Sequence, residues 1–502
     1  MQHFNKCNLY ITAPDFKNGK STPSTGTIYK FSIFILCLVT LLSFFSCKKI
    51  IEIKSPVGSI TTSQVFSAND QAIAATTNLY YNLINTGAIN SSSGFASSSM
   101  TVLCGMSSDE LVPFDQTATS LYAQFMNNKL LSTNNMVYNS FWKNAYSTIY
   151  NANAIIEKIN NSTLVDDSIK KELLGEAKFI RAFCNFYLTN LFGDIPLVTS
   201  LNWHNTSLLS RSPASEVYKA IISDLKDANN LLSPDFLMGN NERIFPTKWA
   251  AAALLARTYL YLKDWGNADE NATKVINETN TFNLEGNLNN VFLYDSKEAI
   301  WQLKQSNSTN TYNATPEGYL LIPRSITANP FCYLNGTLLS SFEPEDLRRY
   351  YWIDSVIYNG VKYFYPKKYK EGPSQAAPNN PYKEYYIVLR LAEVYLIRAE
   401  AKANQNFLSE AIADLNEIRN RAGLVDLPFT LTKDQVLSAV EQERKIELFA
   451  EWGHRWLDLK RTERANAVLS PIKPDWNNYA TLYPIPLNDI KTDPNLFQNP
   501  GY

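Results

Sequence analysis

A repeated spacing of small residues constrains the fold of this chain more than any other feature. Ala256 and Ala268 lie twelve residues apart in one apolar-periodic segment, and Ala399 and Ala411 lie twelve apart in another. Small residues at this spacing let the two helices of a hairpin approach closely, as in tetratricopeptide repeats. The pattern predicts a scaffold of packed helical hairpins, and chance similarity between two amphipathic hairpins is the alternative.

Helical periodicity continues outside these hairpins. Apolar residues at helical spacing predict five more helices, over residues 69–84, 138–160, 168–192, 214–232 and 434–451. Asn69 or Asp70 is expected to cap the first of them. The helix over 168–192 is expected to stop at Gly193, with Pro196 just beyond, because glycine and proline are typical helix stops.

Two long polar stretches lie between the helical parts, over residues 86–135 and 281–386. The first is rich in Ser, Thr and Asn and is predicted to be a loop excursion. The second contains short alternating runs, which predict a little β-structure over 299–303, 351–358 and 362–369. Trp301 and Trp352 lie in apolar alternation and are predicted to be core residues.

We therefore predict one mainly α domain over residues 47–502, in which helical hairpins form a scaffold for long irregular loops and minor β-structure. The scaffold segments are predicted at 69–85, 138–280 and 387–465. The loops at 86–135 and 281–386 are predicted to form the ligand side, because binding residues usually lie on loops that a rigid scaffold positions.

The N-terminal 46 residues are expected to be a lipoprotein signal and to take no part in the fold. An apolar run of 15 residues, Phe31–Phe45, follows Lys30 and precedes Ser46 and Cys47. The run is shorter than the ~20 residues that a spanning helix needs. Cys47 is thus predicted to carry the lipid and to attach the protein to a membrane surface without crossing it. An ordinary secretory signal or a single anchor helix is the alternative.

Composition excludes several classes of function. The chain carries 46 basic and 47 acidic residues, so it lacks the positive charge of a nucleic-acid-binding protein. After Cys47 only Cys104, Cys184 and Cys332 remain, with no CxxC or Cys/His cluster, and no metal site or cofactor is predicted. No serine elbow, HExxH pair or phosphate-binding glycine loop occurs, and we predict that the protein is not an enzyme.

The densest group of charges lies between Glu443 and Arg461. Glu443, Glu447 and Glu451 are spaced at i,i+4 on one helix face, among several arginines and near Trp452. Paired carboxylates could catalyse glycoside hydrolysis. Alternating Glu and Arg among tryptophans fit a partly buried ion-pair network better, and that is the prediction.

Several segments, taken in order, resemble the SusD/RagB family of outer-membrane lipoproteins from Bacteroidetes. They cover nearly the whole chain after Cys47 and comprise EAKFIRA at 176–182, LFGDIPLV at 191–198, AALLARTYL at 252–260, LRLAEVYLIRAEA at 389–401, ERKIELFAEWGHRWLDLKR at 443–461, YPIP at 483–486 and QNPGY at 498–502.

The resemblance implies a surface lipoprotein that binds a nutrient, usually a glycan, and delivers it to a SusC-like TonB-dependent transporter. It also implies a fold with tetratricopeptide-like hairpins on one side and an irregular ligand-binding half on the other. Lys48 and Lys49 follow Cys47 where surface-exported relatives often carry acidic residues, which leaves outward orientation less supported than attachment. The alternative function is a protein-interaction scaffold, or a relative that captures peptides.

Two loop regions, 109–127 and 304–335, offer the side chains that sugars need. Aromatic faces stack on the C–H-rich faces of sugar rings, and Asn, Asp or Arg can bind hydroxyl groups. The ligand-binding residues predicted on this basis are Phe114, Asp115, Tyr122, Asn127, Tyr312, Tyr319, Arg324 and Tyr333.

Overall fold

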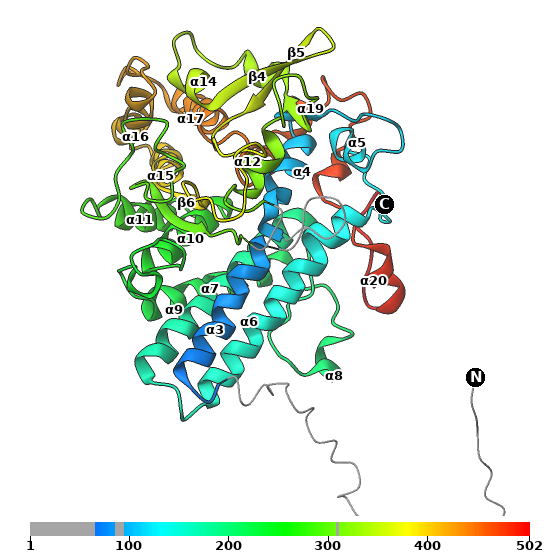
Figure 1. Cartoon of the computed structure of the whole chain (residues 1–502), viewed down its shortest axis with the longest axis vertical. Coiled ribbons are helices and arrows are strands. Elements are labelled where there is room, and N and C mark those ends of the chain that lie inside the picture. Colours follow the sequence, from blue (N-terminus) through cyan, green and yellow to red (C-terminus); the bar gives the residue numbers. More distant parts are fainter. Residues whose placement is uncertain (1–65, 86–94, 308–310) are drawn as a thin grey trace, which may run out of the picture. The chain divides into compact units, whose positions relative to one another are not determined.

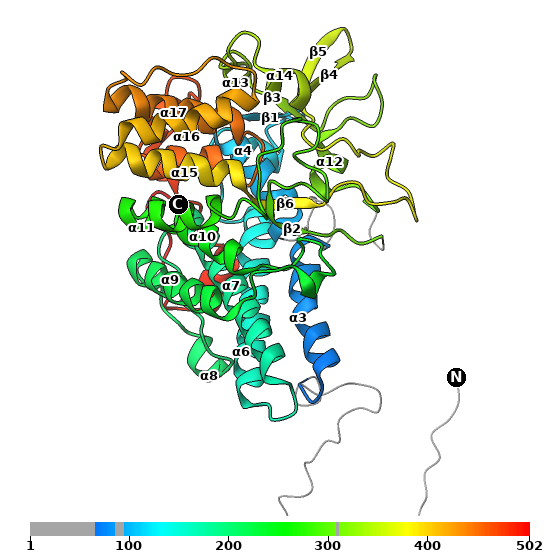
Figure 2. The same ribbon diagram turned by 90° about the vertical axis from the view of Figure 1, so that its left-hand side faces the viewer.

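A stack of antiparallel helices forms one side of the protein, and short strands and loops form the other (Figures 1 and 2). The computed structural model describes residues 66–85, 95–307 and 311–502, and these belong to one compact unit, Thr62–Tyr502. The predicted signal and Cys47 lie outside the described residues. Among the residues that are described, no helix has the length and apolar character needed to cross a bilayer.

The helical stack runs through much of the chain, each helix packing on the next or on a close neighbour. Its members are α6 (Asn144–Asn161), α7 (Asp167–Phe192), α9 (Ala214–Leu231), α10 (Lys248–Tyr261), α11 (Trp265–Ile276), α15 (Leu391–Asn404), α16 (Leu408–Arg421) and α17 (Lys433–Glu447). The helix α3 (Asn69–Ile84) packs against α6 and α7. The mainly α fold is thus confirmed.

The alanines that predicted the hairpins lie where the helices meet. Ala256 of α10 and Ala268 of α11 are fully buried, as are Ala399 of α15 and Ala411 of α16. Each pair of helices packs together, and α11 also packs on α15, which joins the two hairpins into one layer. The predicted helix stop is also confirmed, since α7 ends at Phe192 and Gly193 has a positive φ of 76°.

In the described residues, the strands form three separate two-stranded antiparallel sheets. In two of them β2 (Ala299–Leu303) pairs with β6 (Tyr386–Arg390), and β4 (Ile353–Tyr358) pairs with β5 (Val361–Pro366). The third sheet joins β1 (Leu111–Pro113) to β3 (Cys332–Leu334). The predicted β-structure in 281–386 is therefore present. Trp301 and Trp352 are fully buried, which confirms them as core residues.

Shorter elements fill the connections between these parts. They are α8 (Trp203–Thr206), α12 (Pro316–Leu321), α13 (Gly336–Leu339), α14 (Leu347–Trp352), α18 (His454–Arg461), α19 (Ala465–Leu469), α20 (Leu487–Thr492), the 3₁₀ helices Leu237–Gly239 and Asn478–Thr481, the π-helical turn Val137–Lys143, and the kinked segment Phe95–Ser99, whose backbone leaves helical geometry at Ser97 and Ser98.

The stretch 86–135 departs from its prediction, because it contains the buried helix α4 (Met100–Ser107) as well as α5 (Leu121–Met126). All eight residues of α4 are buried. Gly453 at the start of α18 lies so close that a Cβ there would be 2.6 Å from Cys104 Cβ. A helix buried on every side has no polar stripe, so periodicity could not reveal it.

The predicted cap of the first helix was also wrong. Ala68 is the N-cap residue of α3 and makes no side-chain cap. Asn69 instead donates from Nδ2 to Asp166 Oδ2 at 2.7 Å, just before α7 begins. The Asn69 side chain therefore links the start of α3 to the start of α7, and it does not cap the free backbone N–H groups of α3.

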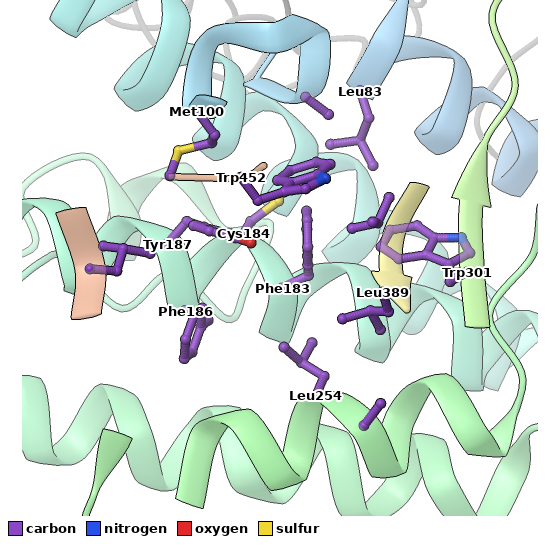
Figure 3. Close-up of a cluster of buried hydrophobic side chains, with 14 of the residues drawn as sticks. Leu83, Met100, Phe183, Cys184, Phe186, Tyr187, Leu254, Trp301, Leu389 and Trp452 are labelled. Carbon is purple, nitrogen blue, oxygen red and sulfur yellow. The ribbon is translucent and has the colours of Figure 1, made fainter. Parts of the chain in front are cut away.

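Aromatic rings from distant parts of the chain meet in the core (Figure 3). Phe183 of α7 lies 5.2 Å from Trp301 and 5.5 Å from Trp452, measured between ring centroids, in edge-to-face geometry. Leu254 of α10 and Leu389 of β6 pack in the same cluster. This core joins the helical stack to the strand side and holds both in place.

Candidate functional site

The two predicted binding loops meet through the pairing of β1 with β3. Val112 lies opposite Tyr333 in this small sheet. The pairing continues beyond β1, because the backbone N–H of Phe114 donates to the carbonyl oxygen of Phe331 at 3.0 Å. Residues more than 200 positions apart in the sequence thus lie side by side, and Figure 2 shows β1 and β3 together near α4.

Four aromatic rings form a cluster at this junction, which we call the aromatic cluster: Phe114, Tyr333, Tyr358 and Tyr363. The ring centroid of Phe114 lies 5.5 Å from that of Tyr358 and 5.7 Å from that of Tyr363. Tyr333 lies 5.0 Å from Tyr363. All four rings are half-buried, so each is held by its neighbours and keeps part of its surface for a ligand.

Polar groups border the aromatic cluster. Gln116 Nε2 donates to the Tyr333 hydroxyl at 3.1 Å. Asp115 is exposed, and its Oδ1 accepts from the N–H and hydroxyl of Thr117 at 3.1 and 2.8 Å. These hydrogen bonds lower the pKa of the Asp115 carboxyl, so it is ionised at neutral pH. The cluster combines apolar faces with donors and acceptors at its edge.

Two further predicted residues lie at α5, Tyr122 within the helix and Asn127 directly after it. The Tyr122 ring packs edge-on against Phe331 with centroids 5.1 Å apart, and burial raises the pKa of its hydroxyl to about 12. Asn127 is half-buried at the C-terminal end of α5, where its N–H donates to Ala123 O. Tyr122 is thereby placed next to the β1–β3 junction, because Phe331 directly precedes β3.

The remaining predicted residues lie around α12. Tyr319 is half-buried within this helix, and Tyr312 precedes it with a positive φ of 49°. Arg324 follows the helix and is exposed. Within the described ranges, no ring contact or hydrogen bond joins any of these three side chains to the aromatic cluster.

Tyr358 and Tyr363 were not predicted as site residues. They lie on the β4–β5 hairpin, whose turn is formed by Asn359 and Gly360 with φ values of 49° and 78°. Asn-Gly between two alternating strands is a strong signal for a tight hairpin turn. Tyr358 directly precedes this turn and pairs with Val361, and Tyr363 lies two residues beyond Val361, so both tyrosines lie on one face of the hairpin. The turn signal was available in the sequence.

The charged segment from Glu443 to Glu451 forms a buried ion-pair network. Glu447 accepts hydrogen bonds from Arg348, Arg390 and Arg421, and these cations hold the pKa of its carboxyl well below the usual range. Glu451 is bound by Arg390 and Lys368 in the same way. The predicted network is confirmed, although most of its cations come from outside the segment that predicted it.

The same part of the molecule offers little for catalysis. His454 is buried, and burial lowers the pKa of its imidazole to about 4, so it is neutral at physiological pH. The carboxylates of the network are tied to cations and have little exposed surface. In the part of the chain that the structure describes, no group of three or more His, Cys, Asp or Glu could hold a metal ion.

Comparisons with known proteins agree with this architecture. The family described as "Starch-binding associating with outer membrane" matches residues 69–260, and the "SusD family" matches residues 354–502. The chain is similar to SusD-like protein P2 of Formosa agariphila, with 29% identity over 93% of this chain and 99% of the relative. The chain belongs to the SusD/RagB family.

Solved structures show the same fold. A SusD superfamily protein from Bacteroides vulgatus aligns with a TM-score of 0.75 and 22% identity, covering 86% of this chain and 99% of that protein. A laminarin-binding SusD-like protein aligns with a TM-score of 0.70 and 23% identity, covering 86% and 99%. At these identities the likeness concerns the fold.

Proposed function

We propose that the protein binds a glycan at the outer membrane and delivers it to a SusC-like TonB-dependent transporter. The observation that carries the proposal is the aromatic cluster, where two loops and a hairpin present half-exposed rings with a polar border. Rings held in this way can stack on sugar faces, while Gln116 and Asp115 can bind hydroxyl groups. Asn127, Tyr312, Tyr319 and Arg324 are proposed to extend this surface.

The family supports the proposal in two ways. One of the two matching family descriptions mentions starch binding and association with the outer membrane. One relative of similar fold binds laminarin by its name. The proposal assigns a binding role, without catalysis and without a cofactor, because the buried carboxylates are occupied by cations.

Glycan binding is tested with a polysaccharide array, followed by affinity measurements on Phe114→Ala and Tyr363→Ala. A stacked ring buries roughly 50–100 Å² of apolar surface, worth about 1–3 kcal/mol, so each change should weaken binding roughly five- to a hundredfold. Tyr150→Ala is the matched control, since Tyr150 is an exposed aromatic residue on α6. Binding by both cluster variants at the wild-type level would place the site elsewhere.

Membrane attachment is tested separately at Cys47. The proposed lipid would be added to its thiol, so Cys47→Ala should lose incorporation of a fatty acid probe and release the protein from the outer-membrane fraction. Retention of the variant in that fraction, with no probe incorporated into the wild type, would contradict the lipoprotein proposal.

A protein-binding role for the helical side is the second candidate. A cavity of about 400 Å³ lies between α15, α17 and α18, and Glu441 and Arg464 at its wall form a half-exposed ion pair of 3.1 Å. Such a charged hollow could receive a transporter or another protein partner. A scaffold of this kind would bind no polysaccharide on the array, which separates the two functions.

A further inference from the structure

A second hollow lies at the base of the β4–β5 hairpin, apart from the aromatic cluster. It has a volume of about 500 Å³, within the usual range for ligand pockets. Arg349, Tyr350 and Tyr351 of α14 line one part of it, and Asp354, Lys367 and Lys370 line another. We call it the hairpin pocket. Figure 1 shows α14 leading directly into β4 at this place.

The charge of the hairpin pocket is unbalanced. Its lining contains three basic side chains and one acidic one, on a chain whose net charge is −1. Asp354 is already bound, because its Oδ2 accepts from Lys367 Nζ at 2.5 Å. In the ranges that the structure describes, neither Arg349 nor Lys370 has a carboxylate within ion-pair distance. Both cations therefore line the hollow without a direct ion pair to the described residues, although the carboxylates of Glu384 and Asp354 act on Lys370 from a longer distance.

Within the described part of the chain, Lys370 is fixed in place by backbone oxygens and not by an ion pair. Its Nζ donates to the carbonyl oxygens of Tyr351 and Lys367 at 2.5 and 2.6 Å. Burial and the neighbouring Lys367 lower the pKa of its ammonium to about 8. A bound anion would relieve both effects, since it supplies the opposite charge in a partly desolvated site.

Arg349 is held more loosely. Among the described residues, its guanidinium makes one hydrogen bond, from Nη1 to Leu339 O at 3.2 Å, and it lies 5.7 Å from the ring centroid of Phe364. Arg349 is exposed, so its other donors are available to a ligand. A guanidinium matches the geometry of carboxylate and sulfate oxygens, which it can bind with two parallel hydrogen bonds.

Aromatic surface lies beside these cations. Tyr350 is 78% exposed, and its ring packs edge-on against Tyr351 with centroids 5.0 Å apart. The pocket also shares its hairpin with the aromatic cluster, since Asp354 and Tyr358 lie about 13 Å apart along β4. A sugar ring on Tyr350 with an acidic group toward Lys370 would satisfy both the stacking surface and the charge.

We infer that the hairpin pocket binds acidic sugar units, those carrying a carboxylate or a sulfate ester, and that the protein prefers acidic to neutral glycans. This inference rests on the proposed glycan-binding function and names its ligand class. The two sources of negative charge share one recognition chemistry, so the experiment must distinguish them.

The test measures affinities of the full-length protein for two matched pairs of polymers. Dextran sulfate against dextran varies the sulfate ester on one backbone, and polygalacturonate against its methyl ester varies the carboxylate. At least one acidic polymer should bind roughly tenfold or more tightly than its neutral partner, as expected for one charged hydrogen bond. Raising the salt concentration should weaken this preference.

Variants then locate the preference. Arg349→Gln and Tyr350→Ala change exposed side chains, so folding should persist. Each should lower the affinity for the acidic polymer roughly 10- to 100-fold. Lys219→Gln on α9 is the matched control, because Lys219 is an exposed cation far along the chain from the pocket. Melting curves check that all three variants are folded. Unchanged binding by Arg349→Gln and Tyr350→Ala would overturn the assignment to this pocket.

Other outcomes separate the inference from the function on which it rests. If the neutral polymers bind as well as their acidic partners, the inference fails and glycan binding stands. If no polysaccharide of the two pairs or of the array binds, both fail. Poly-L-glutamate serves as a polyanion without sugars, and equal affinity for it would show that the pocket recognises an acidic peptide and not a glycan.

Discussion

Arg348 and Arg349 are neighbours in α14 and meet opposite surroundings. Arg348 is fully buried and binds Asp346, Glu443 and Glu447. Arg349 is exposed, and among the described residues its side chain donates to one carbonyl oxygen, that of Leu339. The charge of Arg348 is paired with carboxylates that join α14 to α17, whereas Arg349 has no such pair in the ranges that the structure describes and is available to a ligand.

The same contrast separates the two sides of the molecule. Where the helical stack meets the strand side, cations and carboxylates are buried in mutual contact, and their charges are compensated. On the hairpin, aromatic rings and cations keep exposed surface. Substitutions in the buried ion-pair network should therefore change stability, and substitutions on the β4–β5 hairpin should change ligand binding.

The largest effect is expected at Glu447. Glu447→Ala would leave Arg348, Arg390 and Arg421 with less than their full set of partners in a buried site. Breaking a buried pair typically costs about 3–5 kcal/mol, so we expect a loss of this size in the free energy of unfolding by denaturant titration. Glu441→Ala is the control, since Glu441 is only half-buried, and about 0–1 kcal/mol is expected. Equal losses of unfolding free energy in the two variants would contradict the contrast between the buried network and the exposed hairpin.

A somewhat smaller effect should appear in the pH dependence of stability. Tyr80 donates to the buried Glu176, and burial raises the pKa of that carboxyl from 4.5 to about 8. The folded state then holds the proton more tightly than the unfolded state, so this group lowers stability as pH rises from about 4.5 to about 8. Glu176→Gln should remove this decline and gain up to a few kcal/mol relative to wild type at pH 8.

Glu447 should show the opposite sign. Its pKa is lowered in the folded state, so its contribution is present above its ordinary pKa and is lost as pH falls below it. Glu447→Gln should therefore flatten the acid limb of the stability profile, while Glu176→Gln flattens the neutral limb. Parallel profiles of wild type and both variants, measured by urea titration between pH 3 and 8, would refute the assignment of opposite shifts.

Overpacking of the hairpins should cost less than breaking the ion-pair network. Ala256→Leu and Ala399→Leu insert a larger side chain where two helices touch, and we expect a loss of about 1–3 kcal/mol. Ala74→Leu on α3 is the control, because Ala74 is exposed. Melting curves measure the loss, and glycan affinity should be unchanged in all three folded variants. A loss of affinity without a loss of stability would contradict the separation of roles.

Much of the fold could be predicted because its signals are local. Helical periodicity and the spacing from Ala256 to Ala268 depend on residues within one hairpin, and the structure agrees with them. The helix α4 gave no such signal, since it is buried on every side. The pairing of Arg390 and Arg421 with Glu447 also had no local sequence signal, because Glu447 is distant from both in the sequence.

The candidate site was predicted in part for the same reason. Aromatic residues in polar loops identified Phe114 and Tyr333 as candidates, yet nothing local shows that β1 pairs with β3. Tyr358 and Tyr363 were assigned only to β-structure, and their role follows from contact with Phe114. The composition of a loop can be predicted, whereas its neighbours depend on the tertiary structure.

The smallest effects are expected for the predicted residues around α12. Tyr312 and Tyr319 are half-buried and have no described contact with the aromatic cluster, whereas Tyr122 packs against Phe331 beside it. We expect Tyr312→Ala and Tyr319→Ala to weaken glycan binding by less than about fivefold, which corresponds to about 1 kcal/mol. Tyr122→Ala should weaken binding more and also lower the melting temperature, because it removes a ring contact. Titration of the array's best glycan against each variant, with a melting curve, measures both. If Tyr319→Ala costs more affinity than Phe114→Ala, the ligand lies over α12, and the aromatic cluster is only its border.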